Sequence, residues 1–192
     1  MKKSLILALL LAGCATPSSK IQTPDPMQVD EMRAATKTLA TQLGGTLKQE
    51  MAAHGPEAAV GVCKEMAPKI AADLSKQTGW KVARVGTRVR NTETGTPDAW
   101  DTKALTVFAE RIKQGEKAEA MELAEVVVEP SGPFLRYAKA VAIQPPCLIC
   151  HGSPDDIPKG VRARLQSEYP MDQATGYRLG ELRGAVVVKR AL

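Results

Sequence analysis

Apolar residues recur at steps of three and four in the first half of the chain and alternate with polar residues in the second half. The first pattern predicts a helix over about residues 28–53, with one apolar stripe. This stripe consists of Met32, Leu39, Leu43, Leu47 and Met51. Gly44-Gly45 weakens the middle of this helix, because glycine has low helix propensity.

A second helix is predicted from about Pro56 to Gly79. Its apolar face contains Val60, Cys63, Ala67, Ile70 and Leu74. This periodicity puts Cys63 on the buried side. Pro68 predicts a kink or a helix restart just after Ala67, because proline disrupts a helix interior.

The rest of the chain predicts strands and two shorter helices. The alternating or apolar segments are 80–90, 122–129, 134–143 and 185–189. In the first of them, Arg84, Arg88 and Arg90 share one face. Asp98 is the predicted N-cap of a helix that stops at Gly115, and a short helix covers about 160–168. The second and third strands are joined by a hairpin-like turn at 130–133. Helices first and clustered strands later predict an α+β fold with N-terminal helices on a mostly antiparallel sheet.

The N-terminus predicts export. Lys2 and Lys3 precede an apolar run from Leu5 to Leu11, which is too short to span a bilayer. Leu11-Ala12-Gly13-Cys14 resembles the lipobox of bacterial lipoproteins, in which the cysteine becomes a lipidated N-terminus. We therefore expect a signal peptide over 1–13, a lipid anchor at Cys14 with a proline-rich tether over 14–27, and one globular domain over 28–192.

This leader predicts a protein of the cell envelope, anchored to the membrane through Cys14 and facing the periplasm. Ala15 follows the lipid cysteine, where an aspartate would signal inner-membrane retention in enteric bacteria, so the outer membrane is favoured. Loss of Lys2 and Lys3 lowers the formal charge from +5 to +3, and no basic run of five or more remains. Nucleic acid is therefore not an expected partner.

Cysteine use points to the chemistry. Once Cys14 carries lipid, Cys63, Cys147 and Cys150 remain in an oxidising compartment, and an odd number leaves one thiol outside any disulfide. Cys147-Leu148-Ile149-Cys150-His151 has the C-x-x-C-H spacing of c-type haem attachment. Two thiols three positions apart reach the two vinyl groups of one porphyrin, and the adjacent His151 presents its imidazole to the iron. We expect one covalent haem c.

Two other uses of the cysteine pair compete with haem. A structural zinc site needs four ligands, which could be Cys147, Cys150 and Cys63 with either His54 or His151. A thioredoxin-like redox pair belongs in a βαβ unit, whereas this pair follows two antiparallel strands. Export and the adjacent histidine favour haem over both.

The chain resembles a known family, the PAS-like c-type haem domains, which occur as exported proteins and as sensory modules of signalling proteins. The matching segments are Val62-Cys63-Lys64-Glu65 with Ala67-Pro68, Arg90-Asn91, Pro97-Asp98 with Trp100, Cys147 to Gly152, Tyr169-Pro170, Gly176-Tyr177 and Gly184-Ala185-Val186. The resemblance implies a PAS-like fold and implies that Cys63 is the second axial iron ligand, opposite His151. Thr92 stands where the family often has proline, which leaves the shape of that loop open.

Other residues are alternatives for iron or for the haem carboxylates. His54 is the only other histidine, although an exposed residue at a helix end is its ordinary interpretation. Methionine also ligates haem iron in cytochromes c, and the candidates are Met51, Met66 and Met121.

The arginines on the first strand have two interpretations of equal weight. Arg84, Arg88 and Arg90 could pair with haem propionates, or they could form a solvated strand face. Tyr169 and Tyr177 follow the haem motif. They could pack on the edge of the haem ring, but filling the core is their expected role.

Three function classes are compatible with such a haem: a redox or small-ligand sensor, a periplasmic electron-transfer cytochrome and a haem enzyme. An enzyme is not expected, because a peroxidase or oxygenase needs polar distal groups and no distal histidine–arginine pair is recognisable. The resemblance favours a sensor, which would act on a separate redox or signalling protein.

Overall fold

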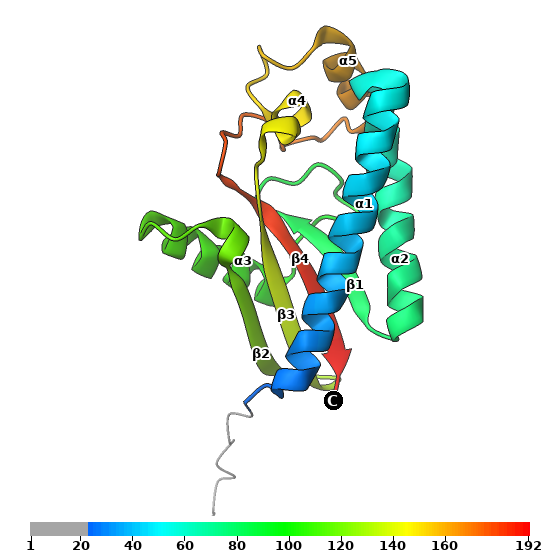
Figure 1. Cartoon of the computed structure of the whole chain (residues 1–192). Helices are drawn as coiled ribbons and strands as arrows, with labels where there is room; N and C mark the ends of the chain where they lie inside the picture. The colour runs from blue at the N-terminus through cyan, green and yellow to red at the C-terminus, as the bar shows by residue number, and fades with distance from the viewer. Residues whose placement is uncertain (1–22) are drawn as a thin grey trace, which may run out of the picture.

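The computed structural model describes residues 23–192. The predicted signal peptide 1–13, the lipid-anchor residue Cys14 and most of the tether lie outside the described residues. In the described part, a four-stranded antiparallel sheet has α1 and α2 on one face and α3 on the other (Figure 1). The predicted α+β class is therefore confirmed.

The two predicted N-terminal helices form a hairpin. Helix α1 (Pro26–Gly61) starts at Pro26, two residues before the predicted domain boundary, and the Asp25 side chain accepts a hydrogen bond from the Met27 N–H at 2.9 Å. The helix passes through Gly44-Gly45 without interruption and breaks at Gly55, where φ is 84°. Glycine suits that break because a positive φ costs other residues energy. After Gly55 the chain runs back beside itself into α2 (Ala67–Thr78), as Figure 1 shows.

The irregularity predicted at Pro68 takes the form of a widened turn before it. Residues Val62–Met66 form a π-helical turn, η1, and the Ala67 N–H bonds the Val62 carbonyl five residues back. In a regular α-helix the ring of Pro68 would clash with the carbonyl of Lys64. The wider turn relieves this clash, and it contains Cys63.

The sheet has the strand order β1-β4-β3-β2. Its strands are β1 (Lys81–Gly86), β2 (Glu122–Glu129), β3 (Gly132–Ala142) and β4 (Leu182–Ala191). Successive side chains of β3 lie on opposite faces of the sheet, as strand geometry requires. Leu135 and Tyr137 pack with α1 and α2, whereas Ala138 and Ala140 pack with α3.

Two predicted strands have different lengths in the structure. The segment 80–90 was expected to be one strand, but β1 ends at Gly86, which pairs with Gly184 at the last position of the β1–β4 register. Residues 87–90 leave the sheet toward the haem motif. Strand β4 is longer than the predicted 185–189, because its register with β3 continues from Leu182 to Ala191.

The remaining helices are close to their predicted positions. Helix α3 (Ala99–Lys113) is capped by Asp98 as predicted, and Asp101 completes a capping box. The haem motif forms the short turn η3 (Pro145–Cys147) and the helix α4 (Leu148–His151), and α5 (Lys159–Glu168) follows. No helix within residues 23–192 is both long and apolar enough to cross a membrane.

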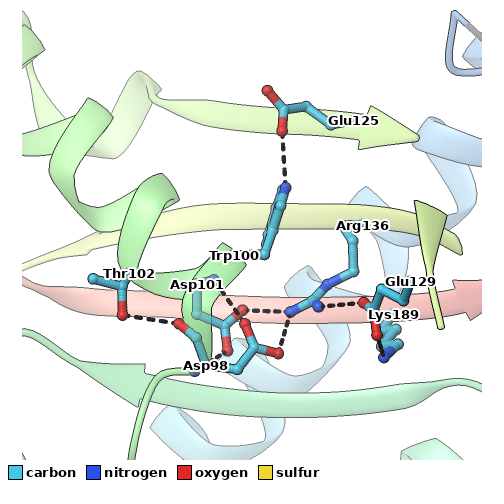
Figure 2. A network of polar contacts seen from close by, with 8 residues as sticks. All are labelled: Asp98, Trp100, Asp101, Thr102, Glu125, Glu129, Arg136 and Lys189. Carbon is cyan, nitrogen blue, oxygen red and sulfur yellow. Dashed lines mark hydrogen bonds and ion pairs between the residues drawn. The ribbon is translucent and has the colours of Figure 1, made fainter. Parts of the chain in front are cut away.

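A charged cluster under α3 connects the helix to the sheet (Figure 2). Arg136 of β3 is almost fully buried and donates to Asp98 at 2.7 Å, Asp101 at 2.9 Å and Glu129 at 3.0 Å. Its guanidinium carbon lies 4.8 Å from the centre of the Trp100 ring. The cluster fixes the start of α3 over the sheet.

Candidate functional site

One cavity brings the haem motif and the helical hairpin together. Its volume is about 560 Å³, and Cys63, Cys147, Cys150 and His151 all line it. In Figure 1, α4 and α5 lie at the end of the molecule where the chain turns from α1 toward α2. The cavity thus brings Cys63 together with the haem motif, although Cys63 and Cys147 are 84 positions apart in the sequence.

The local sequence of the motif determines its shape. Pro145 and Pro146 open the turn η3, and α4 closes when the Gly152 N–H bonds the Leu148 carbonyl at 2.8 Å. A Cβ atom at Gly152 would lie 2.6 Å from that carbonyl oxygen. A glycine after His151 therefore lets the chain leave the motif in this direction.

His151 is held by one ring nitrogen. Its Nδ1 lies 2.6 Å from the carbonyl oxygen of Ala174, which can only accept, so Nδ1 carries the proton. The Nε2 lone pair is then available for a metal, the arrangement typical of metal-ligating histidine. Burial, together with the nearby Arg90 and Arg183 cations, lowers the pKa of His151 to about 2. The imidazole is therefore neutral.

The cysteines at the cavity are free thiols. No disulfide joins Cys63, Cys147 and Cys150, each of which is half-buried. Burial raises the pKa of Cys150 to about 11, so its thiol is protonated at neutral pH. Cys63 was expected on a buried helix face, and its place in η1 turns it toward the cavity wall shared with Cys147 and Cys150.

Of the other predicted ligands, the structure brings only Met51 to the cavity wall. The His54 side chain is 65% exposed and contacts Glu50 Oε1 at 3.0 Å. Met66 is exposed on η1, and Met121 is fully buried in the core on the α3 side.

The three predicted arginines do not share one face, because the strand ends before two of them. Arg84 lines the cavity. Arg88 lies over the Tyr177 ring, 3.8 Å from its centre, and pairs with Glu181 at 3.3 Å. Arg90 lines the cavity but is buried, and its Nε donates to Asp172 at 3.0 Å. The interpretation of a solvated strand face is therefore wrong for Arg90.

Arg183 is a cavity residue that the sequence did not predict. It lies in β4 before Gly184, two positions before the residue at which we expected the strand to begin. Within residues 23–192 it forms no ion pair with a carboxylate, and its Nη1 donates to the Arg88 carbonyl at 3.1 Å. Burial lowers its pKa, as do the Arg90 and Arg84 cations. The one feature of the sequence that could have pointed to Arg183 as a cavity residue is its position as a single arginine next to an apolar predicted strand.

The tyrosines fill space around the site. Tyr169 lines the cavity and is 6% exposed. The Tyr177 ring meets the His151 ring edge-on, with centroids 6.1 Å apart, and its hydroxyl accepts from the Arg88 N–H at 3.0 Å. Both agree with the predicted core role.

The arrangement gives no support to a zinc site. Among the described residues, no group of three or more His, Cys, Asp or Glu side chains is placed to hold a metal ion. Of the two histidines proposed as the fourth zinc ligand, His54 is not at the cavity and His151 is.

Comparison with known proteins identifies the family. The model of the Tll0287-like family matches residues 19–190. The chain belongs to the Tll0287-like family. The crystal structure of the cyanobacterial heme-protein Tll0287 is similar to this chain, with 25% sequence identity and a TM-score of 0.66. The match covers 88% of this chain and 97% of that protein. The resemblance and the fold predicted from the sequence are thereby confirmed. No match was found among curated proteins.

Proposed function

We propose that this member of the Tll0287-like family is an exported, lipid-anchored protein that holds one haem c and acts as a redox or small-ligand sensor. The observation that carries the proposal is the state of His151. Its Nδ1–H is bound to Ala174, its ring is neutral, and its Nε2 is left for iron beside two free thiols.

The residues of the cavity fit this group. Cys147 and Cys150 would form the two thioethers, and a cavity of about 560 Å³ lies within the usual range of cofactor sites. The similarity to a protein described as a haem protein supports the same group here. When bound, the haem supplies an iron that cycles between ferric and ferrous states.

Cys63 is our candidate for the second axial ligand. It lines the same cavity as His151 but comes from η1, whereas His54 points to solvent. Met51 also lines the cavity and is the alternative that the geometry leaves.

Arg84 and Arg183 are suited to the haem propionates. Both line the cavity, and neither forms an ion pair within residues 23–192. Two guanidinium groups would compensate two carboxylates in charge and hydrogen bonding. Arg90 is less suited, because Asp172 already neutralises it.

The position of Cys63 favours a sensor over an electron carrier. It lies in the π-helical turn that joins α1 to α2, and π turns are frequent at functional sites. Lys64 of the same turn pairs with Glu168 at the end of α5. A change in iron ligation at Cys63 would therefore act directly on the helical hairpin and α5, which a simple carrier does not need.

The haem proposal is tested by expression in a host that exports the protein and attaches c-type haem. We expect covalent haem by absorption spectroscopy and intact mass. Cys147→Ser and Cys150→Ser should each retain one thioether, and the double variant should lose its haem to acidic organic extraction. A folded, haem-free protein containing zinc would contradict the proposal.

The axial ligand is tested by electron paramagnetic resonance of the ferric protein. We expect a low-spin thiolate signal that disappears in Cys63→Ala and persists in the matched His54→Ala variant. If the ferric wild type shows no thiolate signal, or if Cys63→Ala leaves its spectrum unchanged, Cys63 is not the ligand. Met51→Leu is the next variant when no thiolate signal is present.

The sensor is separated from the electron carrier by hydrogen exchange of both oxidation states. A sensor should show different amide protection over 56–78 in the ferrous and ferric proteins, and its ferrous form should bind carbon monoxide or nitric oxide. Equal protection in both states and no gas binding would favour the carrier.

The lipid anchor is tested separately. Cys14→Ser should release the protein from the membrane without changing the haem spectrum. Membrane retention after clean signal cleavage would refute the anchor.

A further inference from the structure

Arg90 is the most enclosed ion-paired arginine next to the haem motif. Its side chain is 7% exposed, and that of its partner Asp172 is 11% exposed. The Nη2 of Arg90 donates to the Cys150 carbonyl at 2.6 Å and to the Ala174 carbonyl at 3.2 Å. This pair is not part of the surface charge, because both ions are largely buried and have lost their water.

Arg90 and His151 share one acceptor. The carbonyl oxygen of Ala174 accepts from Arg90 Nη2 and, at 2.6 Å, from His151 Nδ1. Asp172 supports the same peptide, because its Oδ1 accepts from the Ala174 N–H at 2.7 Å. The charge pair is therefore connected to the imidazole through a single backbone carbonyl.

We propose that the Arg90–Asp172 pair positions His151 and sets the redox potential of the iron that this histidine would hold. This inference rests on the proposed haem function. Arg90 and Asp172 are positioning residues, since neither touches the iron in this proposal and both act through Ala174 and His151.

The two charges act on the potential in opposite directions. The Arg90 cation disfavours the more positive ferric state, and its hydrogen bond to Ala174 leaves that carbonyl a weaker acceptor for the imidazole N–H. A weaker bond there makes the imidazole a poorer electron donor, which also disfavours ferric iron. The Asp172 anion has the opposite electrostatic effect.

Potentiometric titration of the purified holoprotein tests the proposal with three variants. Arg90→Gln should lower the midpoint potential, Asp172→Asn should raise it, and the double variant should lie close to the wild type. Arg190→Gln is the matched control, because Arg190 lies near the end of β4, pairs with Glu31 of α1 and is not one of the residues that line the cavity. It should leave the potential unchanged.

A conservative variant separates charge from geometry. Arg90→Lys keeps the cation but loses the fork that reaches both carbonyls, so the potential should stay nearer to the wild type than in Arg90→Gln. The ferric electron paramagnetic resonance g values should nevertheless change, because His151 is held less firmly. A purely structural role would move Arg90→Gln and Asp172→Asn in the same direction, and that result would overturn the proposal.

The readouts keep this inference distinct from the haem proposal. If the wild type carries no covalent haem by intact mass, the proposed function fails. If all variants carry haem but their potentials equal that of Arg190→Gln, the haem assignment stands and the role of Arg90 and Asp172 is refuted.

Discussion

The ring nitrogen Nδ1 of His151 lies 2.6 Å from the carbonyl oxygen of Ala174, a residue 23 positions further along the chain. Two backbone bonds keep this distant segment in place: Gly176 N–H to Gly152 O at 2.7 Å, and Tyr177 N–H to His151 O at 2.9 Å. The orientation of the histidine thus depends on a loop that precedes β4 and not on the C-x-x-C-H motif alone.

Gly152→Ala should damage the site. The added methyl would lie 2.6 Å from the Leu148 carbonyl oxygen, so α4 must shift and His151 with it. We expect incomplete haem attachment, measured as the haem-to-protein ratio, and a stability loss of about 1–3 kcal/mol from overpacking.

Gly61→Ala is the matched control for Gly152→Ala. Gly61 is helical, and a Cβ atom there would meet nothing within 4 Å. Alanine should leave haem attachment unchanged and stabilise the helix by up to about 1 kcal/mol. Equal haem ratios in both variants would show that the turn at Gly152 tolerates a side chain.

Pro68→Ala should alter the environment of Cys63. Removing the ring removes the clash that the π turn relieves, so Val62–Met66 can approach α-helical geometry and rotate Cys63. We expect a weaker low-spin thiolate signal and more high-spin ferric haem. Pro56→Ala, at the start of the returning helix, should not change the spectrum. If both variants match the wild type, packing of the hairpin and not the proline maintains the turn.

Much of the fold and of the site could be predicted from local sequence patterns. Helix periodicity located both arms of the hairpin, Asp98 marked the start of α3, and C-x-x-C-H identified Cys147, Cys150 and His151. These features depend on residues within a few positions of one another, which is where sequence patterns are informative.

The features that escaped prediction depend on tertiary contacts. Whether Arg90 would be solvated or buried is decided by Asp172, 82 positions away, and by the end of β1 at the Gly86–Gly184 pair. Arg183 belongs to the cavity only because β4 begins earlier than its apolar run indicates. The carbonyl of Ala174 has no side-chain signature, so no sequence pattern could have linked it to His151.

Arg136→Met should destabilise the fold. The change leaves Asp98, Asp101 and Glu129 without their shared cation, and breaking a buried ion pair costs about 3–5 kcal/mol. Denaturant unfolding should give this loss, whereas Arg111→Met, which removes a surface pair with Glu116, should cost far less because solvent screens that pair.

The pH dependence of the Arg136→Met defect provides a second check. Burial already raises the pKa of Asp101, and loss of the Arg136 cation removes an opposing effect, so this carboxyl should become easier to protonate. A protonated carboxyl is neutral, so the absence of the Arg136 cation no longer destabilises it. The stability deficit of the variant should therefore shrink as the pH falls from 7 to 4, and a constant deficit would assign the loss to packing alone.

Glu122 should contribute stability that is lost in acid. The hydrogen bonds from Arg33 and from the Tyr137 hydroxyl, which donates to Oε2 at 2.7 Å, outweigh burial and lower the pKa of Glu122 to about 2. Since the folded pKa lies below the ordinary value of 4.5, the contribution is complete above about pH 4.5 and disappears as the pH falls toward 2. Because both side chains are partly exposed, solvent screening limits the contribution of Glu122 to about 1 kcal/mol.

Thermal unfolding tests this contribution. Glu122→Gln should be less stable than the wild type at pH 7 and equal to it near pH 2. Arg33→Gln should reproduce that loss at pH 7, and the double variant should lose little more than either single variant. A Glu122→Gln deficit that persists at pH 2 would mean that the glutamate acts through packing against Tyr137 and not through its charge.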